Sequence, residues 1–230
     1  MELFLRLLLA HMLGDFVFQS AGLVALKKQG YKGLLIHAGV VTFWTFALTW
    51  GYPAKGWAIA FLLSLMHLAS DWARYYWRAR SPLEELASFL GDQLLHIGLI
   101  MGAMAAFGIP IPWGELAHPA ALAWPLKLIL ALILFIFLIW VVPLLEKMVV
   151  EISPACSHSR HLIKVEPTQR FLGAVERVLA LIIFIKVNPL LALLAFIPRI
   201  FTGPKRRCAL YRAAVSLSIT LPAASYLARF

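Results

Sequence analysis

The sequence has few charged residues. Only 14% of its 230 residues are Asp, Glu, Lys or Arg, whereas 62% are hydrophobic and the mean hydropathy is +0.83. Soluble domains carry about 25% charged residues, so this composition excludes an ordinary soluble protein. Residues 131–145 contain no charged side chain, a run that approaches the ~20 apolar residues needed to cross a bilayer. The composition therefore predicts an all-α, polytopic transmembrane helical bundle.

Cysteine and acidic residues are also scarce. Cys156 and Cys208 are the two cysteines, and they lie far apart without CxxC spacing. We interpret them as separate thiols, with neither a disulfide scaffold nor a cysteine metal site. Asp and Glu number 11 against 21 Lys and Arg, which gives a net charge of +10. The basic excess lies in short segments between apolar runs, as the positive-inside rule predicts, so we expect no nucleic-acid partner.

Apolar runs of about membrane-crossing length recur along the chain and predict about seven or eight membrane segments. They cover residues 3–26, 33–50, 56–77, 86–107, 122–145, 171–187, 189–201 and 209–227. The 189–201 run is short enough to be either a span or a re-entrant segment. We divide the chain into residues 1–107, a four-helix membrane core, and residues 108–230, a membrane extension of three to four segments.

Basic residues alternate between the connections of these segments. Lys and Arg gather after the first, third, fifth and seventh runs, and the connections between those are nearly free of them. Lys and Arg concentrate on the cytoplasmic side of a membrane. The polar loop 146–170 is therefore predicted to be cytoplasmic, and both termini are predicted to be periplasmic.

Ionisable side chains recur inside the predicted spans in pairs four residues apart. The pairs are His11 with Asp15, His67 with Asp71, and His96 with Asp92. Residues at this spacing lie on one helical face, so each pair can reach a common point. Separate lipid-facing pairs would each cost several kcal/mol. The pattern predicts one polar site between the first, third and fourth helices, in the cytoplasmic half of the bilayer.

Neutral imidazole together with carboxylate suits a divalent transition metal such as zinc, manganese or iron. As metal ligands we assign His11, His67, Asp71 and His96, and as catalytic carboxylates Asp15 and Asp92. Three further side chains are predicted to hold the ligands in position by hydrogen bonds, namely Gln19, His37 and Gln93. One ion cannot use all the candidates, so either two metals bind or some of the residues only orient the others.

Two other polar features fall at or inside the spans. Arg74 and Arg78 continue the face of His67 toward the cytoplasm, where they could receive an anionic lipid headgroup. Their alternative role is that of ordinary basic anchors. Glu176 and Arg177 interrupt the sixth run; adjacent residues point about 100° apart on a helix, so each is expected to pair with another helix in a structural role.

These motifs resemble a bacterial inner-membrane family, the domain of unknown function 3307. The similarity rests on residues 11–19 (HMLGDFVFQ), His37, residues 67–71 (HLASD) and residues 92–96 (DQLLH), and covers roughly residues 1–105. The second half, with GAVER at residues 173–177, looks like the extension of longer members. The resemblance implies location in the bacterial inner (plasma) membrane and supports the site, but it names no reaction.

Three functions fit these features. The first is a metal-dependent hydrolase or transferase acting on a lipid, a lipid-linked phosphate or a membrane peptide, in which the metal activates water and Asp15 or Asp92 acts as base. HExxH and serine-nucleophile motifs are absent from the sequence. The second is a proton- or cation-coupled transporter or channel, which broken helices would favour. The third is a non-catalytic membrane partner whose polar network fixes helix packing. The sequence leaves the choice, and the oligomeric state, open.

Overall fold

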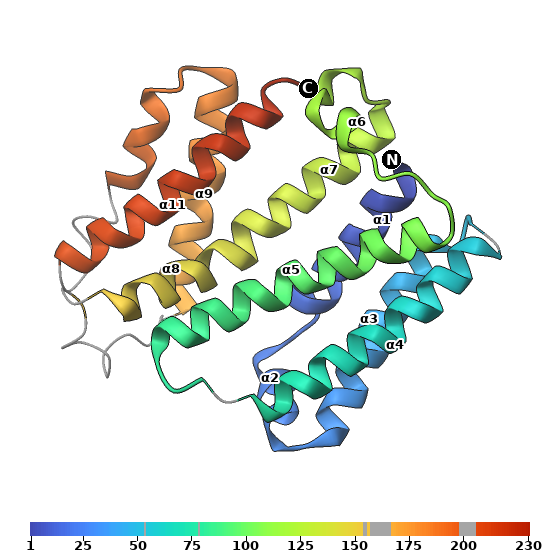
Figure 1. Ribbon diagram of the computed structural model, residues 1–230. Coiled ribbons are helices and arrows are strands. Elements are labelled where there is room, and N and C mark those ends of the chain that lie inside the picture. The colour runs from blue at the N-terminus through green and yellow to red at the C-terminus, as the bar shows by residue number, and fades with distance from the viewer. Residues whose placement is uncertain (53, 78, 154–155, 157–166, 198–205) are drawn as a thin grey trace. The chain divides into compact units, whose positions relative to one another are not determined.

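The computed structural model describes the chain except for residues 53, 78, 154–155, 157–166 and 198–205 (Figure 1). Every regular element among the described residues is a helix. The chain forms two compact units, which consist of residues 1–80 with 87–136 and of residues 81–86 with 137–230.

The first unit is a bundle of helices. Its elements are α1 (Glu2–Met12), η1 (Leu13–Val17), α2 (Ala21–Gln29), α3 (Tyr31–Thr49), α4 (Lys55–Tyr76), α5 (Pro82–Ala106, from residue 87), α6 (Trp113–Ala117), η2 (Pro119–Ala121) and α7 (Trp124–Ile136). α1 packs against α3 and α7, and α3 also packs against α2 and α4. The unit thus includes α7, which the division at residue 107 placed in the second part of the chain.

The first predicted span, residues 3–26, is not one helix. α1 passes into a π-helical turn, η1, and the chain then bends by 84° before α2 (Figure 1). Ser20 starts α2 as its N-cap, because its hydroxyl oxygen accepts a hydrogen bond from the Leu23 N–H at 3.2 Å. The prediction of a continuous helix was wrong here. The break lies within the HMLGDFVFQ motif, and π-helical turns are frequent at functional sites.

Two glycines allow close helix contacts on either side of this break. A Cβ on Gly14 of η1 would lie 2.7 Å from Val41 Cγ2 of α3. A Cβ on Gly33 of α3 would lie 2.3 Å from the backbone of Leu26 and Lys27 in α2. Both distances are too short for a side chain. Glycine at these two positions therefore lets η1 and α2 lie directly against α3.

Three helices are long and apolar enough to cross a membrane. They are α3, α5 and the continuous helix Trp124–Ile152, and the bent pair of α1–η1 with α2 would make a fourth. α4 has 22 residues, about 33 Å at 1.5 Å per residue, but its ionisable side chains lower its hydropathy. The described residues therefore support three or four spans, and the predicted count of seven or eight is not confirmed.

The second unit consists of η3 (Phe137–Val141), α8 (Val142–Ile152), α9 (Pro167–Lys186), η5 (Leu191–Phe196) and α11 (Arg206–Leu227). α11 packs against α8 and α9, and η5 folds back on α9. Its core contains Ala180, Ala192, Phe196 and Ala213. The described part of the predicted 189–201 segment, residues 189–197, contains the six-residue 3-10 helix η5, and residues 198–201 lie outside the described residues.

A disulfide joins Cys156, just after α8, to Cys208 in the first turn of α11. The interpretation of two separate thiols was therefore wrong. The two residues are 52 positions apart, but their Cα atoms are 5.7 Å apart, because α11 packs along α8. Sequence spacing carries no signal for a pairing that tertiary packing creates.

Candidate metal centre

Six of the predicted site residues converge inside the first unit. We call them the His/Asp cluster, which consists of His11 from α1, Asp15 from η1, His37 from α3, His67 and Asp71 from α4, and His96 from α5. Their side chains are all at most 9% exposed. Metal-ligating atoms of His11, Asp15, His67 and His96 lie within 4.8 Å of one another, and so do those of His37, His67 and Asp71. Because His67 belongs to both groups, they form one continuous cluster.

The tightest part of the cluster contains two imidazoles and two carboxylates. His37 Nε2 and His67 Nε2 are 3.1 Å apart. Each of these nitrogens also lies 3.4–3.6 Å from Asp15 Oδ1 and from Asp71 Oδ2. Neighbouring ligands around a four-coordinate zinc ion with bonds of about 2.0–2.1 Å are about 3.3–3.4 Å apart. The separations therefore match the spacing that a shared cation needs.

The second part of the cluster is formed by His11 and His96. Their rings stack with centroids 5.0 Å apart. His96 Nδ1 lies 2.8 Å from the backbone oxygen of Asp92; a carbonyl can only accept, so Nδ1 carries the proton. In the neutral imidazole, Nε2 then has the free lone pair, and it faces Ser70 Oγ at 3.0 Å. A backbone carbonyl that fixes the tautomer in this way is typical of a metal-ligating histidine.

Asp15 lies between the two parts. Its Oδ2 is 3.7 Å from His11 Nδ1, whereas its Oδ1 is 3.4 Å from His37 Nε2 and 3.5 Å from His67 Nε2. Oδ1 is buried and accepts no hydrogen bond of ordinary geometry. A buried carboxylate oxygen without a donor is costly. This oxygen and the neutral imidazoles around it fit a metal ion.

Lys27 reaches the cluster although the sequence did not predict it as a site residue. Its Nζ lies 2.8 Å from Asp71 Oδ2, and its side chain is 19% exposed. Lys27 is in α2, which the bend after η1 and the contact at Gly33 place beside α3. In the sequence Lys27 belongs to the basic segment after the first run, and the positive-inside pattern explains a lysine there. That pattern gives no sign of the contact between Lys27 and Asp71.

Asp92 and Arg74 form an ion pair. Arg74 was predicted to meet lipid headgroups, and Asp92 was predicted to act as a base; both stay predictions, and the structure adds that the guanidinium lies on the carboxylate. Asp92 also accepts a hydrogen bond from the Gln93 side chain at 3.2 Å. Arg74 remains 36% exposed, so one face of it is open. Arg78 lies outside the described residues.

The two glutamines contact histidines of the cluster. Gln19 Nε2 lies 3.2 Å from His37 Nδ1, and Gln93 Oε1 lies 3.2 Å from His11 Nε2. A positioning role for Gln19 and Gln93 would act through these contacts, and it stays a prediction. His37 was given the same role, but it is fully buried and lies directly among the ligand atoms.

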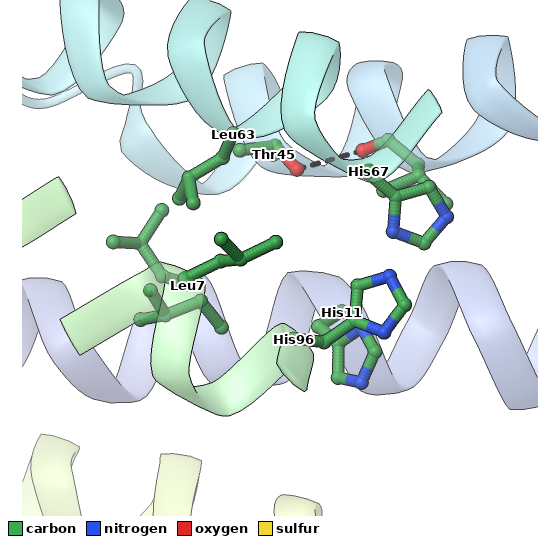
Figure 2. Close-up of a pocket in the computed structure, with 9 residues that line it drawn as sticks. Leu7, His11, Thr45, Leu63, His67 and His96 are labelled. Carbon is green, nitrogen blue, oxygen red and sulfur yellow. Dashed lines mark hydrogen bonds between the residues drawn. The ribbon is translucent and has the colours of Figure 1, made fainter. Parts of the chain in front are cut away.

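A cavity of about 30 Å³ adjoins the cluster, which is room for one or two water molecules. His11, His67 and His96 form one end of it, and apolar residues such as Leu7 and Leu63 form the other (Figure 2). Water in this cavity would lie against the imidazoles.

Glu176 and Arg177 belong to α9 of the second unit. Arg177 is fully buried, and its Nη1 donates to Glu146 Oε1 of α8 at 2.9 Å and lies 3.4 Å from Ser216 Oγ of α11. Glu176 is 7% exposed. Arg177 therefore connects α9 to two other helices, the arrangement expected of a structural ion pair.

Comparison with known proteins identifies a family but not an activity. No curated protein and no solved structure matches the chain. The family described as "Protein of unknown function (DUF3307)" matches residues 3–123, just over half of the chain and a stretch that contains the whole His/Asp cluster. The chain therefore belongs to the DUF3307 family.

Proposed function

We propose that this protein is a multi-pass protein of the bacterial inner membrane that binds a divalent transition metal in the His/Asp cluster and uses it to hydrolyse or transfer a group of a membrane-embedded substrate. The observation that carries the proposal is the convergence of four histidines and two aspartates from five helices, whose ligand atoms form two overlapping groups, each within 4.8 Å. Zinc, manganese and iron all suit this donor set.

The membrane location is supported by the surface of the first unit. Its exposed side chains include aromatic groups near both ends of α4, with Trp57 at the start and Trp72 and Tyr76 at the end. Trp and Tyr gather at the two interfaces of a membrane. On this basis we propose α4 as a further span. The count of seven or eight segments and the periplasmic termini rest on the apolar runs and on the alternation of Lys and Arg in the sequence.

The chemistry follows from the groups beside the cavity. A bound metal ion supplies a water of lowered pKa, and the adjoining cavity has room for that water. Asp15 Oδ1 is the better candidate for a base than Asp92, because Arg74 already occupies the Asp92 carboxylate. Asp15 is also a candidate ligand, and where both of its oxygens bind metal it cannot act as the base.

The substrate class follows from the two cations at the edge of the cluster. Lys27 and Arg74 are the partly exposed cations that pair with Asp71 and Asp92. A phosphate group could exchange for these carboxylates as the partner of either cation. A lipid-linked phosphate or an anionic phospholipid is therefore favoured over a membrane peptide.

Metal analysis of the purified full-length protein in detergent tests this proposal. The wild type should retain zinc or manganese after desalting and should release phosphate from a polyprenyl diphosphate. Asp71→Asn and His96→Ala should lose both properties. His118→Ala, which changes an exposed histidine outside the cluster, should keep both. Metal contents that are equal in the wild type and in Asp71→Asn would contradict the proposal.

Transport of a cation or proton is the second candidate, and one observation favours it. The helix that carries His11 and Asp15 is broken by a π-helical turn and an 84° bend, and broken helices form the ion sites of many transporters. Uptake of zinc or manganese into proteoliposomes, without release of any product from lipid, would support transport. Metal-dependent product release without uptake would support the enzyme.

A further inference from the structure

We propose that the His/Asp cluster holds two metal ions and that the carboxylate of Asp15 bridges them. This inference rests on the proposed metal binding and specifies how the ligands are shared. One ion would be bound by His37, His67, Asp71 and Asp15 Oδ1. The other would be bound by His11, His96 and Asp15 Oδ2.

The first ion position follows from four potential ligand atoms that lie close together. His37 Nε2, His67 Nε2, Asp15 Oδ1 and Asp71 Oδ2 are separated by 3.1–3.6 Å in each nitrogen–nitrogen and nitrogen–oxygen pair. One proton between the two imidazoles satisfies a single pair of these atoms. A metal ion placed between them could bind all four.

The second ion position follows from His96 and His11. The bond from His96 Nδ1 to the Asp92 backbone oxygen leaves Nε2 as a ligand atom, and ligand atoms of His11, Asp15 and His96 lie within 4.8 Å of one another. Asp15 Oδ2 lies 3.7 Å from His11 Nδ1. Three protein ligands with an adjoining water cavity resemble the arrangement of catalytic metal sites, which keep one position for water.

Asp15 connects the two positions for a reason of charge as well as of distance. Asp71 pairs with Lys27 and Asp92 pairs with Arg74, whereas in the described part of the chain Asp15 pairs with histidines alone. Its two oxygens face different histidines. Carboxylates in this position bridge metal ions about 3.5–4 Å apart, and such pairs of ions catalyse displacement at phosphorus. The assignment therefore deepens the preference for a phosphate substrate.

Metal stoichiometry of the full-length protein in detergent tests the inference. After loading with Mn²⁺ and desalting, the wild type should hold two ions per chain, and its electron paramagnetic resonance spectrum should show exchange coupling between them. His37→Ala and His96→Ala should each hold one uncoupled ion. Asp15→Asn should lose the coupling, because a carboxamide offers one oxygen. His118→Ala should behave as the wild type does.

The outcomes separate this inference from the metal-binding proposal. A wild type with one ion per chain, or with two uncoupled ions, overturns the two-metal assignment and leaves metal binding intact. A wild type without metal overturns both. The wild-type spectrum needs no substitution, so the test stands even where a variant fails to fold. Elution of each variant from a sizing column shows whether its stoichiometry can be compared.

Discussion

Replacing Gly14 with alanine should weaken metal binding although residue 14 contributes no ligand. The new Cβ would lie 2.7 Å from Val41 Cγ2 and 3.2 Å from Val41 Cα. Ordinary contact requires about 3.4–4.0 Å, so η1 and α3 must move apart by at least ~0.7 Å. That displacement separates Asp15, the next residue on η1, from His37 on α3, whose closest atoms are now 3.4 Å apart.

The expected size of the effect follows from two known costs. Overpacking a well-packed contact costs about 1–3 kcal/mol, and changes that disturb the support of metal ligands lower metal affinity about 10- to 100-fold. Gly14→Ala should therefore lose stability in that range and bind zinc at least about tenfold more weakly. Competition with a chromophoric chelator measures the affinity, and denaturation in detergent measures the stability.

Two further variants make this test decisive. Gly91→Ala, next to Asp92 on α5, introduces a Cβ with nothing within 4 Å, so it should bind metal as the wild type does. Val41→Ala removes the nearest atom to residue 14 and should restore part of the affinity of Gly14→Ala. Wild-type affinity in Gly14→Ala, or no improvement in the double variant, would show that the contact between η1 and α3 does not position Asp15.

Three other perturbations test the Lys27–Asp71 pair, the packing of α2 against α3 and the disulfide. Lys27→Met removes the ammonium that competes with a metal ion for Asp71. Zinc should therefore bind more tightly, while the stability of the metal-free protein should fall by roughly 1–3 kcal/mol. Weaker zinc binding in a titration would refute the competition. Gly33→Ala should destabilise the protein, because its new Cβ would lie 2.3 Å from the α2 backbone. Gly39→Ala in the same helix has open space around its new Cβ and should be neutral or stabilising in thermal melts. Equal melting temperatures for the two variants would refute the close contact. Cys208→Ser opens a disulfide of sequence separation 52 and should cost about 4 kcal/mol in the oxidised protein; an unchanged denaturation midpoint would show that the bond is not formed.

The convergence of the site could be predicted from the sequence because the spacing itself carries the geometry. His67 with Asp71 and His96 with Asp92 each lie one turn apart, so a single helical face presents both groups. An energetic argument then requires the pairs to meet, since isolated charges inside a membrane are costly. Neither step depends on the tertiary structure beyond the presence of helices.

The break in the first span could not be predicted in the same way. Apolar residues continue on both sides of Asp15, and one glycine within an apolar run is a weak signal. The break exists because Gly14 fits against Val41 and because Ser20 caps a new helix. The second cause is a local contact between Ser20 and Leu23, whereas the first depends on α3, which comes later in the sequence. The direct position of His37 among the ligands has the same origin, because its partners come from other helices.

Charge balance connects Lys27 to the number of ions that the cluster can hold. Asp15, Asp71 and Asp92 provide three negative charges, and Lys27 and Arg74 provide two positive ones, which leaves one negative charge at Asp15. One divalent ion changes the net charge of these groups from negative to positive. If Lys27 withdraws from Asp71, the net charge with one ion is zero. Two divalent ions with Lys27 withdrawn leave a surplus of two positive charges, which a phosphate dianion neutralises. Excess charge is costly in a low-dielectric site, so the second ion and an anionic substrate should bind cooperatively. Lys27, carried by the surface helix α2, is the group whose movement allows that exchange.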